Sequence, residues 1–267
     1  MQTVRPPAVA GMFYPAETAR LRHEIDAMLA AATPGKLAPK ALIVPHAGYL
    51  YSGPVAASAY AALGPIAPHI RRVVLLGPTH RVAVRGLALS GAARFATPLG
   101  EVELDHEAAR AIADLPQVTL SERAHAMEHS LEVQLPFLQS VLGEFRLLPL
   151  AVGMATHEEV SEVLERLWGG KETLIVISSD LSHYLPYAAA KRCDDLTTRQ
   201  ILGLDQRITH EQACGATPIN GLLHAARHHH LTAHLLDQRN SGDTAGPRDG
   251  VVGYAAFAFT EEVRHVQ

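Results

Sequence analysis

The sequence predicts an α/β protein with one domain, residues 1–267, in which helices flank a central, mostly parallel or mixed sheet. Short apolar runs rich in β-branched residues alternate along the chain with longer stretches of helical periodicity. The apolar runs are continuous, as is typical of strands buried on both faces. Neither an internal repeat nor a low-complexity linker divides the 267 residues, so we expect a single domain.

Seven runs predict strands, and apolar residues at helical spacing predict seven helices. The strands are ALIVP (41–45), RRVVLLG (71–77), GLALS (86–90), FRLLPLAVG (145–153), ETLIVISS (172–179), LTAHLLDQ (231–238) and VVGYAAFAF (251–259). The helices are 17–32, 53–63, 105–114, 127–142, 157–168, 187–203 and 217–229. Their alternation places helices on both faces of the sheet.

Composition argues against several classes of function. The formal net charge is −4, and no Lys/Arg cluster with interleaved aromatic residues suggests nucleic-acid binding. No apolar run approaches the roughly 20 residues of a membrane span, and the N-terminus lacks the apolar core of a signal peptide. Two cysteines, Cys193 and Cys214, are too few for a disulfide framework or a four-cysteine zinc site. We therefore expect a reducing, cytoplasmic compartment.

Histidine follows three of the predicted strands within a few residues. LIVPHAGY contains His46, VVLLGPTH ends at His80, and LIVISSDLSHY contains Asp180 and His183. Ligands of open α/β sheets bind outside the carboxyl ends of the strands, so we expect these side chains to line one pocket. One histidine at a strand end is more often a hydrogen-bonded loop residue. The joint occurrence predicts a shared site, and neutral imidazole is the commonest metal ligand.

Asp180 and His183 are three residues apart. If a helix begins near Ser179, both lie on one face of its first turn, where they could act together in catalysis. An N-cap of the same helix is an equally good interpretation of Asp180. Spacing alone leaves both interpretations open.

The segment HAMEHSLEVQLPFLQSVL, residues 125–142, contains two histidines and two glutamates at i, i+4 spacing. His129 and Glu132 could face a pocket from the same side of the predicted helix. For Glu128 we favour a solvated polar face. The glutamate stands directly before the second histidine, so the zinc-protease motif H-E-x-x-H is absent.

The segment QRNSGDTAGPRDGVVGYAAF, residues 238–257, is rich in Gly and Asp. It predicts either a plain series of turns or a cover over the pocket that supplies Asn240, Ser241, Asp243 or Thr244. The sequence has no nucleophile elbow, no P-loop and no dinucleotide-binding glycine motif. These absences leave a histidine-based site as the chemistry to be explained.

Six stretches, in order along the chain, resemble the Memo-type family, which in bacteria and archaea is often identified as AmmeMemoRadiSam system protein B. They are RPPAVAGMFYP, PHAGYLYSGPVAASAY, GPTH, EHSLEVQLPFL, SSDLSHY and NSGD with VVGYAA. The resemblance runs from about Arg5 to Phe259. The family is similar in structure to the class III extradiol dioxygenases. The resemblance therefore implies a LigB-like fold with a pocket at the strand ends.

In those dioxygenases two histidines and one carboxylate hold Fe(II), and a further histidine serves as acid and base. The resemblance implies that His46 and His80 bind the metal. It also implies that His183 takes the acid/base position, with Asp180 beside it. Fe(II) is the expected ion, and another divalent metal is the alternative.

The third ligand is where this sequence departs from the dioxygenases, which use a glutamate. Vertebrate Memo proteins have a cysteine in the segment that matches NSGDT. Here Thr244 takes that place, with Asp243 next to it. Asp243 is the expected third ligand because threonine binds iron poorly, and Thr244 and His129 remain as alternatives.

Three functions follow from the residues and the resemblance. The first is a metal-dependent oxidoreductase of the dioxygenase type, which acts on a small aromatic or related molecule. The second is a non-catalytic binding or adaptor protein that uses the same pocket. For it, the family resemblance implies AMMECR-type and radical-SAM proteins as partners. The third is a divalent-metal hydrolase, with His183 as base and Asp180 orienting it.

Overall fold

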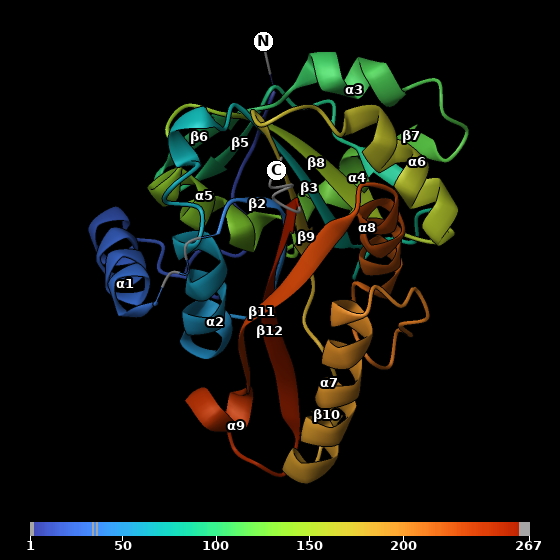
Figure 1. The fold of residues 1–267 in the computed structure, drawn as a ribbon. Coiled ribbons are helices and arrows are strands. Elements are labelled where there is room, and N and C mark those ends of the chain that lie inside the picture. Colours follow the sequence, from blue (N-terminus) through green and yellow to red (C-terminus); the bar gives the residue numbers. More distant parts are fainter. Residues whose placement is uncertain (1–2, 34, 36, 262–267) are drawn as a thin grey trace, which may run out of the picture.

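In the computed structural model, which describes residues 3–33, 35 and 37–261, helices cover both faces of one large sheet (Figure 1). Its centre is four parallel strands in the order β2 (Pro39–Val44), β9 (Thr173–Ser178), β3 (Arg72–Pro78) and β8 (Arg146–Val152). Nearly all of their residues are buried. Burial on both faces explains why the sequence shows continuous apolar runs here. The α/β prediction is confirmed.

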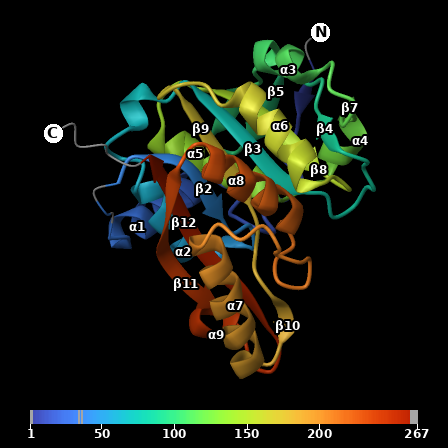
Figure 2. The ribbon, with the colours of Figure 1, turned by 45° about the vertical axis from the view of Figure 1, so that its right-hand side comes forward.

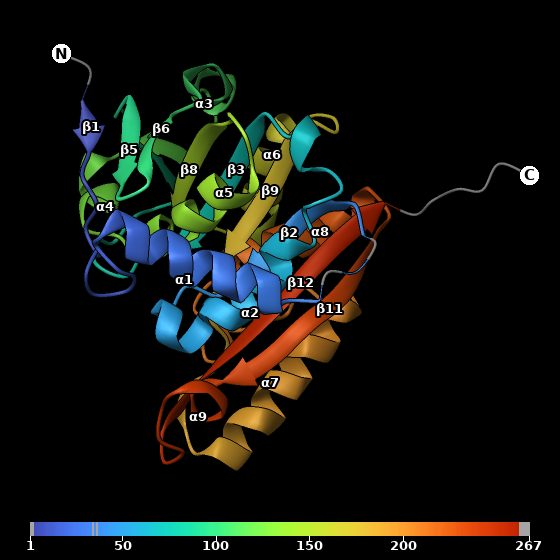
Figure 3. The ribbon, with the colours of Figure 1, turned by 90° about the vertical axis from the view of Figure 1, so that its left-hand side faces the viewer.

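Strands at both edges make the sheet mixed. On one side β4 (Leu87–Leu89) pairs antiparallel with β8 and parallel with β7 (Val118–Leu120). On the other side β12 (Val251–Glu261) pairs antiparallel with β2, and β10 (His183–Leu185) and β11 (Leu231–Asn240) both pair with β12. Phe257 lies opposite Ile43, so the first part of β12 extends past the carboxyl end of β2. Figure 3 shows this extension, with α7 (Tyr187–Leu202) beside it.

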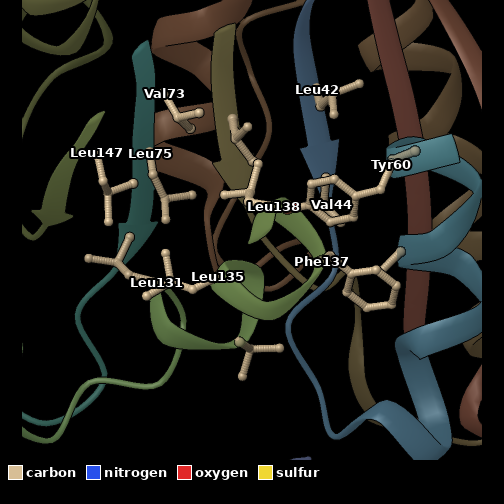
Figure 4. Close-up of a cluster of buried hydrophobic side chains, with 14 of the residues drawn as sticks. Leu42, Val44, Tyr60, Val73, Leu75, Leu131, Leu135, Phe137, Leu138 and Leu147 are labelled. Carbon is tan, nitrogen blue, oxygen red and sulfur yellow. The ribbon is translucent and has the colours of Figure 1, made fainter. Parts of the chain in front are cut away.

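Two apolar cores lie on opposite faces of the sheet. The first is covered by α1 (Thr18–Ala31), α2 (Tyr49–Ala61) and α5 (Leu135–Val141). The second is covered by α3 (His106–Ile112), α6 (His157–Leu167) and α8 (Ala216–His228) (Figure 2). Strand residues alternate between the faces: Leu42 and Val44 belong to the first core, and Ile43 to the second. Figure 4 shows part of the first core, where Phe137 of α5 stacks on Tyr60 of α2.

The remaining elements are short. β1 (Val4–Arg5), β5 (Arg94–Thr97) and β6 (Gly100–Glu103) form a small second sheet. The other helical segments are α4 (Glu122–Ala126), α9 (Ser241–Thr244) and two 3₁₀ turns, η1 (Ala67–His69) and η2 (Glu132–Gln134). Among residues 3–33, 35 and 37–261, no helix has both the length and the apolar character needed to cross a membrane.

The seven predicted strands and six of the seven predicted helices are confirmed, with shifted ends. The helix predicted at 127–142 is wrong. Residues 127–131 form a loop, η2 follows, and α5 begins only at Leu135 with Pro136 in its first turn. Proline has no amide hydrogen and fits only the start of a helix, so a helix through this position was unfavourable.

A buried aspartate on α7, Asp194, makes folding dependent on pH. Its carboxylate accepts a hydrogen bond from the Ser182 amide at 3.1 Å. It lies so close to Gly253 that a side chain there would collide with it. Burial raises the pKa of Asp194 to about 6 from an ordinary value of 3.8. The folded protein therefore holds this proton more tightly than the unfolded chain does.

The stabilisation from protonated Asp194 is complete below pH 3.8 and is lost as the pH rises through about 6. A pKa change of this size corresponds to at most roughly 3 kcal/mol. We expect Asp194→Asn, which keeps an acceptor for Ser182 without the charge, to increase the free energy of unfolding at pH 8. At pH 4 the gain should be much smaller. Urea unfolding at both pH values measures the difference, and an equal effect at the two would contradict the prediction.

Candidate metal centre

Three histidines from separate parts of the chain converge at the carboxyl ends of the parallel strands. His46 follows β2, His80 follows β3, and His129 lies in the loop between α4 and η2. One ring nitrogen of each lies within 4.8 Å of the others. The ring centroids are 4.5 to 5.4 Å apart. The structure thus brings the two strand-end histidines together and adds His129 to them.

The hydrogen bonds around Ser178 fix the tautomer of His46. The Ser178 hydroxyl donates to the Ser130 carbonyl at 2.6 Å and accepts from Gln134 Nε2 at 2.7 Å. Its oxygen lies 2.9 Å from His46 Nδ1 and has no proton left to give. His46 Nδ1 therefore donates, and His46 Nε2 keeps a lone pair. Burial lowers the pKa of His46 well below its ordinary value, so the ring is neutral at pH 7.

Glu128 orients the other two rings. Its carboxylate accepts from the His80 amide at 2.6 Å and from His80 Nδ1 at 2.9 Å, and it lies 3.3 Å from His129 Nδ1. Burial alone would raise the pKa of Glu128, but the hydrogen bonds and charge of His80 outweigh it and bring the pKa to about 2. An ionised carboxylate only accepts hydrogen bonds, so it favours the proton on Nδ1 of both rings. Both Nε2 atoms are then free to bind a ligand.

The interpretation of Glu128 as part of a solvated polar face is wrong. The residue is 2% exposed. The carboxylate also accepts from the amides of His129 and Ser130, at 3.0 and 2.9 Å. The same group that orients the rings therefore also shapes the loop that carries one of them. The sequence interpretation failed because it assumed a helix here.

The three imidazoles, when none of them carries a proton on Nε2, form a donor set that fits a divalent transition metal. Burial lowers the pKa of His129 to about 4, so a proton does not compete for its Nε2 at neutral pH. Each Nδ1 is paired with a group behind it, as is usual for histidine ligands in metal sites. Imidazole nitrogen suits iron, zinc and copper, so the donor set alone does not select the ion.

Asp180 and His183 lie close to this cluster, but not on one face of a helix. Residues 179–182 form a loop, and His183 begins β10. Asp180 Oδ1 accepts from the His46 amide at 2.7 Å, and Oδ2 is 4.0 Å from His46 Nε2. His183 is half-buried, and burial lowers its pKa, with a further lowering by the charge of His80. The helix at Ser179, and an N-cap role for Asp180, are wrong.

Asp243, the third ligand expected from the sequence, is not a member of the histidine group in the described residues. Its carboxylate accepts from the Tyr187 hydroxyl at 2.6 Å and from the Asn240 amide at 3.1 Å, so it caps α9. The Thr244 hydroxyl donates to the Ser241 carbonyl at 3.3 Å. Both residues belong to α9, which lies in the connection between β11 and β12 (Figure 1). Of the three alternatives for the third ligand, the structure favours His129.

Cys214 is a neighbour of the cluster that sequence reasoning missed. Its sulfur lies 3.3 Å from His46 Nε2, the atom that would face an ion. Burial raises the pKa of Cys214 to about 12, so the thiol is neutral and can donate to that nitrogen. Both cysteines are free. Cys214 precedes α8 in a connection without a recognisable motif, so the sequence carried no signal for its position.

A buried ion pair ties the histidine loop to the N-terminal segment. Arg5 Nη1 lies 2.7 Å from Glu132 Oε2, and Arg5 also donates to the carbonyls of His125 and Glu128, both at 2.7 Å. Glu132 Oε1 accepts from the Tyr14 hydroxyl at 2.6 Å. Glu132 therefore faces Arg5. The predicted helix had placed Glu132 on the pocket side with His129, and this placement is wrong. The first and fourth family-like stretches are bonded to each other here.

A cavity of about 750 Å³ adjoins the site and is lined in part by His80, His210 and Cys214. Its size suits a small molecule. A larger groove of about 1520 Å³ has Arg72 and Arg146 in its lining, at the amino ends of the parallel strands. Because the histidines lie at the carboxyl ends, the smaller cavity is the one that can place a ligand beside them.

The chain is similar to proteins of one family over nearly its whole length. A family model described as Memo-like protein matches residues 5–258. A MEMO1 family protein of Sulfolobus acidocaldarius is 35% identical, over 96% of this chain and 99% of its own length. One of Aquifex aeolicus is 36% identical with the same coverage, and one of Methanosarcina barkeri is 38% identical over 95% and 99%. An uncharacterised protein of Escherichia coli K12, JW3007, has a similar fold, with a TM-score of 0.53 and 15% identity over 81% of this chain and 98% of that one.

Proposed function

Because the chain belongs to the Memo-like protein family, we propose that its three-histidine site makes it a metal-dependent oxidoreductase of the dioxygenase type. Fe(II) would be held by His46, His80 and His129. The observation that carries this proposal is the convergence of three histidines, with one ring nitrogen of each within 4.8 Å of the others and each Nδ1 next to a polar group behind it. The adjoining cavity would hold a small aromatic substrate.

The reaction needs no separate reductant. In an extradiol cleavage the ring bond beside a hydroxyl-bearing carbon breaks, both atoms of O2 enter the product, and the aromatic substrate supplies the electrons. Fe(II), when bound, would supply open positions for the substrate and O2. The protein's part is to orient the substrate, exclude water and move its hydroxyl protons.

His183 is the proposed acid and base. Its ring is half-buried and neutral at pH 7, since burial lowers its pKa. A neutral imidazole can take a proton from a substrate hydroxyl and return it later. Asp180 holds the loop of His46 in place through the amide hydrogen bond at 2.7 Å. We assign it to positioning the site beside His183.

A hydrolase is the second candidate. The histidine group, in which the described part of the chain places no carboxylate, favours it. Three histidines and an open position are also the ligand set of some catalytic zinc sites. Zinc, when bound, would supply an activated water. His183 would then act as the base and Asp180 would orient the site.

A binding role is the third candidate. The resemblance to system protein B supports AMMECR-type and radical-SAM proteins as partners, with the pocket as a ligand-binding rather than a reacting site. A pull-down of the AMMECR-type and radical-SAM proteins with the tagged full chain tests this role. Retention of either supports the role, and loss of both in the presence and absence of metal counts against it.

Oxygen uptake after anaerobic loading with Fe(II) tests the first candidate. With catechol as the probe, we expect the wild type to retain iron and consume O2. His46→Ala should lose the iron, whereas His183→Ala should keep it and lose most of the uptake, by about 10²-fold or more. Asp243→Asn is the matched control and should behave as wild type. A wild type that retains no iron would overturn the proposal, and ester hydrolysis by the zinc-loaded protein without O2 would favour the hydrolase.

A further inference from the structure

A second group of histidines lies on the surface between α6 and α8, away from the pocket motifs. His157 begins α6, and His224 and His228 lie one turn apart on α8. The ring centroids of His157 and His224 are 5.5 Å apart, and those of His224 and His228 are 5.1 Å apart. These separations are close to the 4.5 to 5.4 Å between the pocket histidines. We call His157, His224 and His228 the α6–α8 cluster.

Carboxylates flank this cluster on both sides. His157 Nε2 lies 3.0 Å from Glu158 Oε1, and His228 Nδ1 lies 3.9 Å from Glu165 Oε1. Glu165 also binds His229 at 2.8 Å. A cation at the cluster would therefore meet negative charge at both ends, which offsets part of the cost of removing its water.

One buried ring nitrogen of the cluster has no hydrogen-bond partner among the described residues. His224 Nδ1 is buried and makes no hydrogen bond to the described residues. Buried polar atoms without a partner are rare, and an ion or water commonly explains them. His224 is also the central member, since its ring lies near both of the others.

The geometry points to a second metal site here, for a divalent transition ion such as zinc, nickel or copper. Two histidines at i, i+4 on one helix can share an ion, and His157 of α6 supplies a third imidazole. Among residues 3–33, 35 and 37–261, the ligand atoms that already lie within 4.8 Å of one another are those of the pocket histidines His46, His80 and His129. The α6–α8 cluster is more open. To hold an ion, its rings would have to approach one another, and the His228 side chain, which is 68% exposed, has room to rotate.

Zinc alone, titrated against a chromophoric chelator, tests this site on the full chain. We expect two binding events for the wild type. His228→Ala should weaken one event at least tenfold and leave the other unchanged, and His46→Ala should do the reverse. Because His228 is exposed, its loss leaves the fold intact. His23→Ala, which removes an exposed histidine from α1, is the matched control and should keep both events.

The two sites fail separately in this experiment. A wild type with one event, abolished by His46→Ala and unaffected by His228→Ala, would overturn the α6–α8 site and leave the pocket standing. Two events that both survive His228→Ala and His224→Ala would also overturn it. One event that is lost only in His228→Ala would support the surface site and count against the pocket.

Discussion

Replacing Glu132 with alanine is expected to lower the free energy of unfolding by about 3 to 5 kcal/mol. Arg5 and Glu132 form a 2.7 Å ion pair whose side chains are 5% and 0% exposed. Without the carboxylate, the guanidinium stays buried beside no counter-charge. Tyr14 and the amides of Ala8 and Val9 lose an acceptor as well. Urea denaturation of the metal-free protein measures the loss.

An exposed ion pair provides the control for Glu132. Arg94 and Glu101 lie 3.2 Å apart with side chains 47% and 46% exposed, so Glu101→Ala should cost less than about 1 kcal/mol. The double variant Arg5→Met/Glu132→Leu should recover the part of the loss that comes from the unpaired guanidinium, because it removes both members of the ion pair. The part that comes from the lost acceptor of Tyr14, Ala8 and Val9 should remain. If Glu132→Ala is as mild as Glu101→Ala, the ion pair does not hold the N-terminal segment to the histidine loop as described.

Replacing Glu128 with glutamine is expected to weaken metal binding about 10- to 100-fold, the usual effect of removing a group that orients histidine ligands. In the variant, a side-chain NH2 group replaces one carboxylate oxygen. This donor would face other donors, namely His80 Nδ1 and the backbone N–H groups of His80 and Ser130. The two rings then lose the group that fixes their tautomers. Dissociation constants measured by chelator competition report the change.

Stability and affinity must be separated for Glu128. Thermal unfolding of the metal-free variant shows how much of the effect comes from the fold alone. Glu24→Gln, at an exposed pair with Arg20 on α1, changes the same chemical group away from the site and should leave the affinity unaltered. An unchanged affinity in Glu128→Gln would contradict the assignment of His80 and His129 as ligands.

The fold was predictable where strands are buried on both faces, because such strands appear in the sequence as continuous apolar runs. The strands β2, β3, β8 and β9 are buried on both faces, and their sequences show it. Most of the short elements were not predictable, although the three-residue strand β4 was predicted from GLALS. β10 has three residues, and α9 is held by its own capping contacts rather than by an apolar pattern. The segment 127–142 was wrongly predicted as one helix because its leucines follow helical spacing. Glu128 instead stabilises a loop, and Pro136 favours a helix that begins only at Leu135.

The site was predictable only in part. His46 and His80 stand at strand ends, and the topology of an α/β sheet gathers such positions at one edge. His129 comes from a loop whose position depends on contacts distant in sequence, above all those of Arg5 with Glu132 and the main chain. Cys214 lies beside His46 for the same kind of reason. Local spacing does not encode such contacts.

X-ray absorption by the protein loaded with one equivalent of Fe(II) tests the three-histidine site most directly. Scattering from imidazole rings reports how many histidines bind the iron. We predict three in the wild type and in Asp243→Ala, and two in His129→Ala with weaker retention of the metal. A His129→Ala spectrum identical to that of the wild type, with a change in Asp243→Ala instead, would contradict the three-histidine site.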